Sequence, residues 1–501
     1  MMRLIINAHD HQARTAIIDH SGRHRYKELL DASFKIALQL LKGRSDLQEA
    51  RIAFMVRPSF EYVATQWGIW RAGGIAVPIC VSYPAPSIEY LLDDTQAEQV
   101  IADGEFQRLL APLCKYRGIS LLPAAKTFLE LDPAPIAQLP DIKPNRRAMV
   151  IYTSGTTGKP KGVVTRHSAL ETQIRMLVEA WKWEKEDHIL NILPLHHVHG
   201  VVNMLSCALW SGACCEFLPA FDAEKVYERF EKGEINLFMA VPTIYYKLIA
   251  HFEGMPPNRQ QKVSHKLGDF RLMVSGSAAL PVSTLERWKE ISGHTLLERY
   301  GMTEMGMAIS NPYEGERRPG CIGQPLPGMS IRLVNDEGKV VPLGESGEIQ
   351  VKGANVFQEY WRKPEATQKA FTKEAWFQTG DIAVIEKGYY RILGRNSVDI
   401  IKSGGYKISA LEIEEILRKY PGITDCAVVG VPDEEWGERV VAGLVIDNSE
   451  IDKENLTSWL KEQLPGYKIP RSYRVLKDLP RNTMGKVTKI RLKKMFGNPT
   501  Q

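Results

Sequence analysis

The sequence of 501 residues has no long hydrophobic run and little excess charge. Because no stretch of about 18 apolar residues occurs, we expect no membrane-spanning helix. The formal net charge of +5 is small for this length, so the composition does not indicate nucleic-acid binding. Near the start, the apolar run Leu4-Ile5-Ile6 is too short for a signal peptide. We therefore expect a cytoplasmic protein without a nucleic-acid partner.

Cysteine is scarce as well. The seven cysteines are odd in number and show no spacing typical of metal ligands. Cys214 and Cys215 are adjacent in an apolar stretch and are expected in the core. The pattern therefore indicates no disulfide framework, which fits a reducing compartment.

The length and the order of apolar segments predict more than one domain. In the first half, helical periodicity over residues 26–41 and 59–72 alternates with strand-like runs at 51–56 and 75–80. This alternation favours a parallel α/β sheet. After about residue 325, glycine, proline and charged turns separate short strands, which indicates a β-rich subdomain. A linker is predicted at 394–397, followed by an α+β unit of about 105 residues.

One run directly follows an apolar, β-prone segment and combines hydroxyls, glycines and two lysines. It consists of Thr153, Ser154, Gly155, Thr156, Thr157, Gly158, Lys159, Pro160, Lys161 and Gly162. Glycines let backbone N–H groups approach an anion, and hydroxyl and ammonium groups add donors for phosphate oxygens. A flexible polar turn is the alternative, but strand, loop and cations together favour a phosphate-binding loop.

This loop differs from the Walker A motif of P-loop NTPases. Two residues separate Gly155 from Gly158, where that motif has four, and Pro160 follows Lys159 in place of a hydroxyl residue. Proline also removes a backbone N–H donor. A P-loop NTPase is therefore disfavoured.

A second run, Glu298 to Glu304, places an aromatic ring beside two oxygen-bearing side chains. Tyr300 can stack on a purine, and Thr303 can donate to a phosphate. Glu304 can help to hold Mg²⁺, which prefers oxygen ligands. A strand end with a polar turn is the alternative interpretation of this run by itself.

Together the two runs resemble those of the adenylate-forming superfamily, which includes acyl-CoA synthetases, peptide-synthetase adenylation domains and luciferases. The resemblance covers roughly residues 20–495, with the motifs in the expected order. It implies a large N-terminal AMP-binding domain over residues 1–394, with parallel α/β sheets and a β-rich subdomain. A hinge at 395–399 and a small mobile α+β lid domain at 400–501 would follow.

The resemblance also implies roles for individual residues. Tyr300 would contact adenine, Thr303 the α-phosphate, and Glu304 Mg²⁺, and Gly301 and Met302 would belong to the same nucleotide site. Further residues with implied nucleotide contacts are Ser277 and Ala278 on the adenine side, and Asp381 and Arg395 at the ribose. Lys486 matches the mobile catalytic lysine, whose charge would offset that developing between carboxylate and α-phosphate. We expect Lys486 to need positioning rather than an altered pKa.

The turn Lys402, Ser403, Gly404, Gly405 resembles the one that contacts the pantetheine thiol; a plain Gly-Gly hairpin is the alternative. The superfamily's hinge residue, usually Asp or Lys two positions after the arginine, is Ser397 here. Because the segment is also one residue longer, the pivot is left open between Ser397 and Asp399. The basic stretch at 486–494 otherwise indicates a solvated helix face.

The closer likeness is to malonyl-CoA synthetases of the plant and mitochondrial type. It rests on residues 298–307, Ser310-Asn311-Pro312 and residues 396–412. A dicarboxylate needs a cation for its second carboxylate, and Arg271 is the candidate, with His199 as helper. Arg271 as a surface residue is the alternative. In the run 193–200, metal binding by the histidines is disfavoured because no Cys or carboxylate is suitably spaced.

The expected activity is that of an ATP-dependent acid–CoA ligase using ATP, Mg²⁺ and coenzyme A. An acyl-adenylate would form first, and then an acyl-CoA, with release of pyrophosphate and AMP. Malonate or methylmalonate is the expected acid. A medium- or long-chain fatty acyl-CoA synthetase, an amino-acid adenylation module, a luciferase-like oxygenase and a non-catalytic nucleotide-binding protein are the alternatives. The chain is expected to be a monomer or a homodimer.

Overall fold

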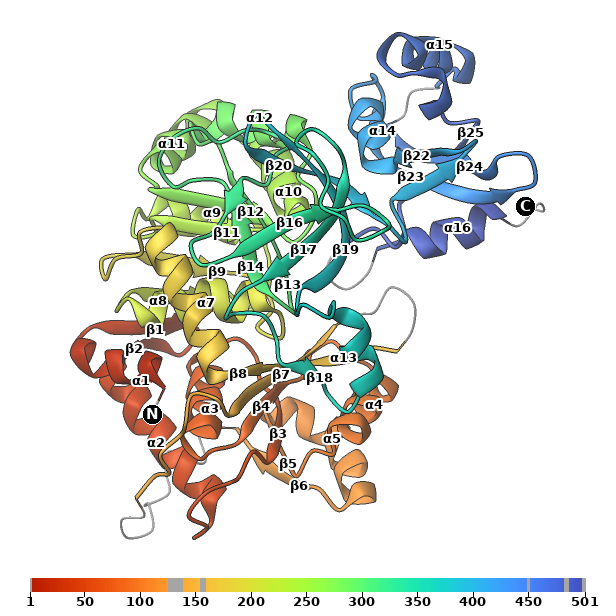
Figure 1. The fold of residues 1–501 in the computed structure, drawn as a ribbon. Helices are drawn as coiled ribbons and strands as arrows, with labels where there is room; N and C mark the ends of the chain where they lie inside the picture. Colours follow the sequence, from red (N-terminus) through yellow and green to blue (C-terminus); the bar gives the residue numbers. More distant parts are fainter. Residues whose placement is uncertain (1, 125–137, 154–158, 448–450, 482–485, 498–501) are drawn as a thin grey trace.

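The computed structural model describes residues 2–124, 138–153, 159–447, 451–481 and 486–497. A large body contains three sheets, and a smaller body with a sheet of its own lies beside it (Figure 1). In the described part, no helix is both long enough and apolar enough to cross a membrane. All seven cysteines are free thiols; Cys215 is buried as predicted, whereas Cys214 is only partly so.

The largest sheet has nine strands in the order β15-β14-β13-β12-β11-β9-β10-β1-β2. Its central strands are parallel and fully buried, as in β11 and β12, which agrees with their short continuous apolar sequences. The bounds are β1 Thr15–Asp19, β2 Gly22–Arg25, β9 His188–Asn191, β10 Cys214–Phe217, β11 Leu237–Ala240, β12 Leu272–Gly276, β13 Leu297–Met302, β14 Gly306–Ser310 and β15 Gln324–Pro325.

The second sheet has seven strands in the order β18-β8-β7-β4-β3-β5-β6. Strands β7 and β8 are antiparallel and pair Thr153 with Lys161, so the predicted phosphate loop joins two neighbouring strands. The bounds are β3 Arg51–Met55, β4 Ile75–Pro78, β5 Gln99–Ala102, β6 Ser120–Pro123, β7 Arg147–Thr153, β8 Lys161–Arg166 and β18 Glu359–Tyr360.

Helices of the large body pack against these two sheets (Figure 1). The first predicted helix, 26–41, is confirmed as α2, and its neighbour begins where the Ser59 hydroxyl accepts from the backbone N–H of Tyr62. The bounds are α1 Arg3–Ala8, α2 Tyr26–Leu41, α3 Phe60–Arg71, α4 Ala85–Thr95, α5 Gly104–Arg117, α7 His167–Ala180, α8 Cys207–Trp210, α9 Ala223–Glu231, α10 Pro242–Glu253, α11 Pro257–Gly268, α12 Val282–Ser292 and α13 Pro364–Ala370. A short 3₁₀ turn, η1 (His9–His11), follows α1, and a π-helical segment, η2 (His199–Ser206), precedes α8.

The third sheet is the predicted β-rich subdomain. Its four antiparallel strands lie in the order β16-β17-β19-β20, with bounds β16 Ser330–Val334, β17 Gly347–Lys352, β19 Phe377–Glu386 and β20 Tyr389–Arg395. The predicted linker at 394–397 begins too early, because β20 pairs with β19 up to the partners Asp381 and Arg395.

The smaller body packs helices against a five-stranded sheet. Its bounds are β21 Ile400–Ser403, β22 Tyr406–Ser409, α14 Ala410–Leu417, β23 Ile423–Asp433, β24 Gly437–Ile446, α15 Lys453–Gln463, β25 Ser472–Val475 and α16 Lys489–Gly497, with a 3₁₀ turn η3 at Gly466–Lys468. The sheet begins at Ile400, directly after the predicted hinge, and its own apolar cluster lies under α14 and α15. The exact domain limits stay a prediction.

Candidate active site

The predicted ribose-binding pair lies on neighbouring strands. Arg395 at the end of β20 donates to both carboxylate oxygens of Asp381 on β19, at 2.8 and 3.2 Å. The Tyr300 hydroxyl, at the end of β13, donates to the same carboxylate at 2.6 Å. Burial alone would lower the pKa of Arg395, but the Asp381 carboxylate more than reverses this effect. The guanidinium is therefore charged and held in one orientation.

The predicted metal ligand Glu304 lies next to this pair and is 7% exposed. The Tyr360 hydroxyl from β18 donates to its Oε1 atom at 2.9 Å, and the Lys161 ammonium lies 4.8 Å from the centre of the Tyr360 ring. Burial raises the pKa of Glu304. A buried carboxylate held by a hydroxyl and, among the described residues, without an ion-pair partner suits a hard cation, so the residues fit Mg²⁺. Tyr360 had no motif of its own and was missed from the sequence.

Only part of the phosphate loop can be located. Ser154, Gly155, Thr156, Thr157 and Gly158 lie outside the described residues. At the far end, the Tyr90 hydroxyl donates to the Pro160 carbonyl at 2.7 Å, and the Lys159 ammonium lies 5.5 Å from the centre of the Tyr90 ring. Helix α4 therefore braces the loop where it returns to β8.

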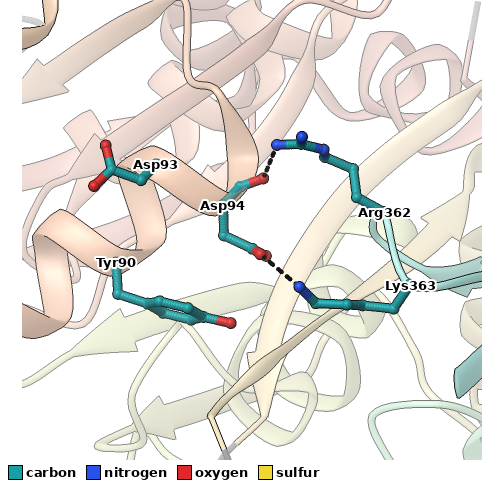
Figure 2. Close-up of a pocket in the computed structure, with 5 residues that line it drawn as sticks. All are labelled: Tyr90, Asp93, Asp94, Arg362 and Lys363. Carbon is teal, nitrogen blue, oxygen red and sulfur yellow. Dashed lines mark hydrogen bonds and ion pairs between the residues drawn. The ribbon is translucent and has the colours of Figure 1, made fainter.

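A cavity of about 310 Å³ lies beside this brace and is lined by Tyr90, Asp93, Asp94, Arg362 and Lys363 (Figure 2). Figure 2 shows the Lys363 ammonium pointing at the Asp94 carboxylate, at 3.2 Å. The Tyr152 hydroxyl donates to the same carboxylate at 2.7 Å. The Asp94 carboxylate is thus held by two neighbours, and the Arg362 guanidinium donates to the Asp94 carbonyl at 3.5 Å, so these contacts join helix α4 to the segment at 362–363.

At the other end of the site, three polar side chains surround the predicted acyl position. Ser277, after β12, has a φ of +72°, a conformation that side chains rarely adopt. Its hydroxyl is 3.2 Å from His199 Nδ1 and accepts from Arg299 at 3.4 Å. His199 begins the π-helical segment η2, a geometry often found at functional sites. Strain and an irregular helix thus coincide at one point.

Arg299, like Tyr360, is a candidate site residue that was not predicted from the sequence. It is 3% exposed, and among the described residues it has no carboxylate partner. Burial lowers its pKa to about 9. A Cβ at Gly276 would lie 2.4 Å from the guanidinium, so the glycine makes room for this side chain. Two adjacent charged residues, Glu298 and Arg299, inside a buried strand were the signal that could have identified it.

Arg271 lies elsewhere and is already in use. Its guanidinium forms a two-pronged ion pair with Asp187, whose side chain is 2% exposed, and donates to the Trp181 carbonyl at 3.1 Å. The pair holds β12 against the turn before β9. The expectation that Arg271 binds a substrate carboxylate is therefore replaced, because its charge is neutralised inside the protein.

Lys486 lies between the two ends of the site. The residue as a whole is exposed, yet the protein groups around its ammonium lower its pKa to about 8. Burial is the largest cause, and the nearby guanidiniums of Arg395 and Arg299 follow. The pKa of Lys486 is thus altered, while its predicted need for positioning stays a prediction. Its charge also lowers the pKa values of His197 and His199, after burial itself.

The predicted CoA turn is the hairpin between β21 and β22, so the Gly-Gly hairpin alternative describes its backbone. Gly404 and Gly405 have φ values of +56° and +82°, and a Cβ at Gly404 would lie 2.9 Å from the Trp436 ring. Lys402 and both glycines are exposed, whereas Ser403 is buried. Of the hinge candidates, Ser397 is exposed and Asp399 is tied into hydrogen bonds.

Known proteins share this architecture and these motifs. Residues 6–361 match the family described as AMP-binding enzyme, and residues 412–486 match the AMP-binding enzyme C-terminal domain. The chain is 45% identical to the mitochondrial malonate–CoA ligase ACSF3 of Bos taurus, over 95% of this chain and 87% of that protein. It is 37% identical to the malonate–CoA ligase of Arabidopsis thaliana, over 97% and 86%.

A solved structure gives the same result. The ATP-bound MatB of Rhodopseudomonas palustris superposes with a TM-score of 0.91 at 33% identity, covering 99% of each chain; its apo form gives 0.82. The expected mixed α/β fold with a small C-terminal domain is therefore confirmed. So is the likeness to adenylate-forming enzymes of the malonyl-CoA synthetase type. This chain belongs to the AMP-binding enzyme family.

Proposed function

We propose that this protein is an ATP-dependent acid–CoA ligase and that its acid is malonate or methylmalonate. One observation carries the choice of acid: a buried arginine, Arg299, lies at the acyl end without a carboxylate partner among the described residues. The names of the relatives support the same choice. Medium- and long-chain fatty acids are the alternative acids.

A buried cation is costly unless an anion compensates it. Arg299 is held by the Ser277 hydroxyl, and His199 lies against the same hydroxyl with its Nε2 atom unpartnered. Burial keeps His199 neutral at physiological pH, so it can donate or accept without adding charge. A second carboxylate would neutralise Arg299 through two parallel hydrogen bonds. A fatty acid would instead leave this charge buried and unpaired.

In the first step, an oxygen of the free carboxylate attacks the α-phosphorus of ATP, and the bond to pyrophosphate breaks. Asp381 and Arg395 would orient the ribose, and the lysines of the phosphate loop would hold the β- and γ-phosphates. Lys486 would offset the negative charge that gathers between carboxylate and α-phosphate. Thr303 would donate to the α-phosphate, and Glu304 would hold Mg²⁺, which when bound neutralises phosphate charge.

In the second step, the CoA sulfur attacks the carbonyl carbon of the acyl-adenylate. The thiol loses its proton as the C–S bond forms, and the C–O bond to AMP breaks. The exposed turn Lys402-Ser403-Gly404-Gly405 is proposed to face the pantetheine after the small domain turns about residues 395–399. The present arrangement, with Lys486 between Arg395 and Arg299, corresponds to the first step.

The test measures pyrophosphate and AMP release from ATP and CoA with malonate, methylmalonate, acetate, octanoate and palmitate. Malonate or methylmalonate is expected to give the highest kcat/KM. A preference for octanoate or palmitate would overturn the choice of acid and leave the ligase. If none of these acids supports release while ATP still binds, the choice of acid is overturned and the acid lies outside this set.

We also propose a cytoplasmic location and a monomer or homodimer. The Bos taurus relative is named as a mitochondrial enzyme, so the location of this protein needs a direct test. Cell fractionation with the tagged full-length chain, compared with mitochondrial and cytosolic markers, decides it. Sedimentation at several concentrations gives the oligomeric state.

A further inference from the structure

The basic stretch at the C-terminus contains one residue that is not solvated. Lys489, the first residue of α16, is 7% exposed. Its ammonium lies 2.7 Å from Asp399 Oδ1 and 2.6 Å from Glu414 Oε1. The expectation of a solvated helix face is therefore wrong at this position. Burial would lower the pKa of Lys489, but the two carboxylates raise it, so the group is charged.

Asp399 connects this lysine to the ribose end of the site. Its second oxygen, Oδ2, accepts from the backbone N–H of Arg395 at 3.0 Å, and its own N–H donates to the Arg395 carbonyl at 2.7 Å. The Arg395 side chain in turn holds Asp381. One carboxylate within the predicted hinge thus joins the nucleotide-binding arginine to the start of α16.

Glu414 connects the same lysine to the small body. Its Oε1 atom accepts from the backbone N–H of Val428 on β23 at 2.7 Å, and Arg418 lies 3.7 Å from its Oε2 atom. The side chain of Glu414 is only 5% exposed. Lys489 is therefore fixed from two sides, by the hinge through Asp399 and by the small domain's sheet through Glu414.

The segment that carries Lys486 is anchored at both of its ends. Upstream, the Arg481 guanidinium pairs with Asp425 on β23, and Arg481 forms a β-bridge with Val487. The Thr488 N–H donates to the Pro480 carbonyl at 2.7 Å. Downstream, Lys489 follows Lys486 by three residues. Lys486 is therefore joined to the buried Lys489 through the backbone of only two residues, Val487 and Thr488.

We propose that Lys489 is a positioning residue for the adenylation step: its buried ion pairs with Asp399 and Glu414 hold the Lys486 segment against the hinge. The inference rests on the proposed ligase function and adds a residue to it. Without the ammonium, Asp399 and Glu414 would face each other as two carboxylates, and their repulsion would separate the hinge from α16. A displacement of about 1 Å at Lys486 is enough to cost about 100-fold in rate.

The first experiment separates the two half-reactions in Lys489→Met. Adenylation is measured as acid-dependent exchange between ATP and pyrophosphate, and thioester formation is measured from supplied acyl-adenylate and CoA. We expect kcat for exchange to fall about 30-fold or more, with KM for the acid changed less than about twofold. Thioester formation is expected to stay within about twofold, because Lys486 acts only in adenylation.

The matched control is Lys493→Met on the same helix, which removes the pair with Glu438 at 3.0 Å. This pair is more exposed and makes no contact with the hinge, so both half-reactions should be unchanged. A merely structural role for Lys489 predicts that both half-reactions and Tm fall in parallel, and that result would overturn the proposal. So would an Asp399→Asn, Lys489→Met double variant whose defects add fully.

A measurement that does not depend on turnover can test the role of Lys489 separately from the proposed ligase function. The reactivity of the Lys486 amine toward an acylating reagent, followed by mass spectrometry across pH, reports its pKa. In the wild type the reactivity of Lys486 is expected to rise near pH 8, because the surrounding groups lower its pKa to about 8. In Lys489→Met this pKa should rise by about one unit, as the lysine leaves the two guanidiniums. An unchanged pKa overturns the positioning role, whether or not malonate is the acid.

Discussion

The two ends of the site treat their arginines in opposite ways. At the ribose end, Arg395 is paired with Asp381, and Tyr300 binds the same carboxylate. At the acyl end, Arg299 is more deeply buried and contacts only a serine hydroxyl among the described residues. A neutral ribose needs oriented donors and acceptors, whereas a charged acid needs a free charge. The paired arginine therefore indicates the ribose end, whose groups are already oriented. The arginine without a carboxylate partner indicates the acyl end, which can bind an anion.

A second arginine sharpens this contrast. Arg271 precedes the first residue of β12, whereas Arg299 on the neighbouring strand β13 pairs with Gly276 at the other end of β12. Arg271 forms an ion pair with the buried Asp187, which holds β12 against the turn before β9. Both residues are arginines beside β12, but an internal carboxylate neutralises Arg271 and, among the described residues, none neutralises Arg299.

The largest expected effect comes from removing the unpaired charge. In Arg299→Met, kcat/KM for malonate is expected to fall by about 100- to 1,000-fold, which matches the cost of stripping one partner from a buried charge pair. Acetate has no second carboxylate, so its low kcat/KM should stay within about threefold. Steady-state pyrophosphate release with the two acids measures both. Equal losses for malonate and acetate would contradict the role assigned to Arg299.

The paired end should respond differently. In Asp381→Asn, the side chain keeps its shape but loses the charge that holds Arg395 and accepts from Tyr300. We expect KM for ATP to rise about 10- to 30-fold, the equivalent of one charge-assisted hydrogen bond. The ratio of malonate to acetate activity should not change, since the acyl end is untouched. A changed acid preference would show that the two ends are coupled.

Local patterns in the sequence predicted much of the fold and the nucleotide motifs. The helix over residues 26–41 has a continuous apolar stripe, and β11 has a short apolar run, so each is recognisable from its own residues. Asp381 and Arg395 also belong to one hairpin, whose strand register brings them together. Features decided within about fifteen residues were thus accessible without a structure.

Features that depend on distant partners were not accessible. Nothing near Arg271 reveals that Asp187, 84 residues earlier, neutralises it. Lys489 has the same difficulty, because its partners Asp399 and Glu414 lie in other elements and the surrounding residues are basic. A charge pattern shows which residues carry charge, but the tertiary fold decides which of them are neutralised.

The pH dependence tests the position of Lys486 between the two arginines. Its pKa of about 8 means that the charged, active form is lost as the pH rises through 8. We expect kcat/KM for adenylation to fall up to about tenfold per pH unit above this value. In Lys486→Arg, whose guanidinium stays charged over this pH range, the fall near pH 8 should disappear. If kcat/KM of that variant still fell above pH 8, the titrating group would be a residue other than Lys486.

The smallest expected effect on activity, and a large one on stability, comes from Arg271→Gln. The variant leaves Asp187 buried with the Glu184 N–H at 2.8 Å and the Asn236 amide at 3.2 Å as its partners. We expect the free energy of unfolding to fall by about 3 kcal/mol, because a buried charge loses its counter-ion. The malonate-to-acetate ratio should change less than about twofold.

The matched control for that variant is Asp187→Asn combined with Arg271→Gln, which removes both charges. Most of the lost stability is expected to return, since no uncompensated charge is left in the interior. Denaturant unfolding of the three proteins, beside their activities on the two acids, separates the outcomes. If Arg271→Gln lost malonate activity while the double variant regained stability but not activity, Arg271 would bind the acid after all. The presence or absence of an internal carboxylate partner would then not distinguish Arg271 from Arg299, because an arginine already neutralised by Asp187 would still bind the substrate.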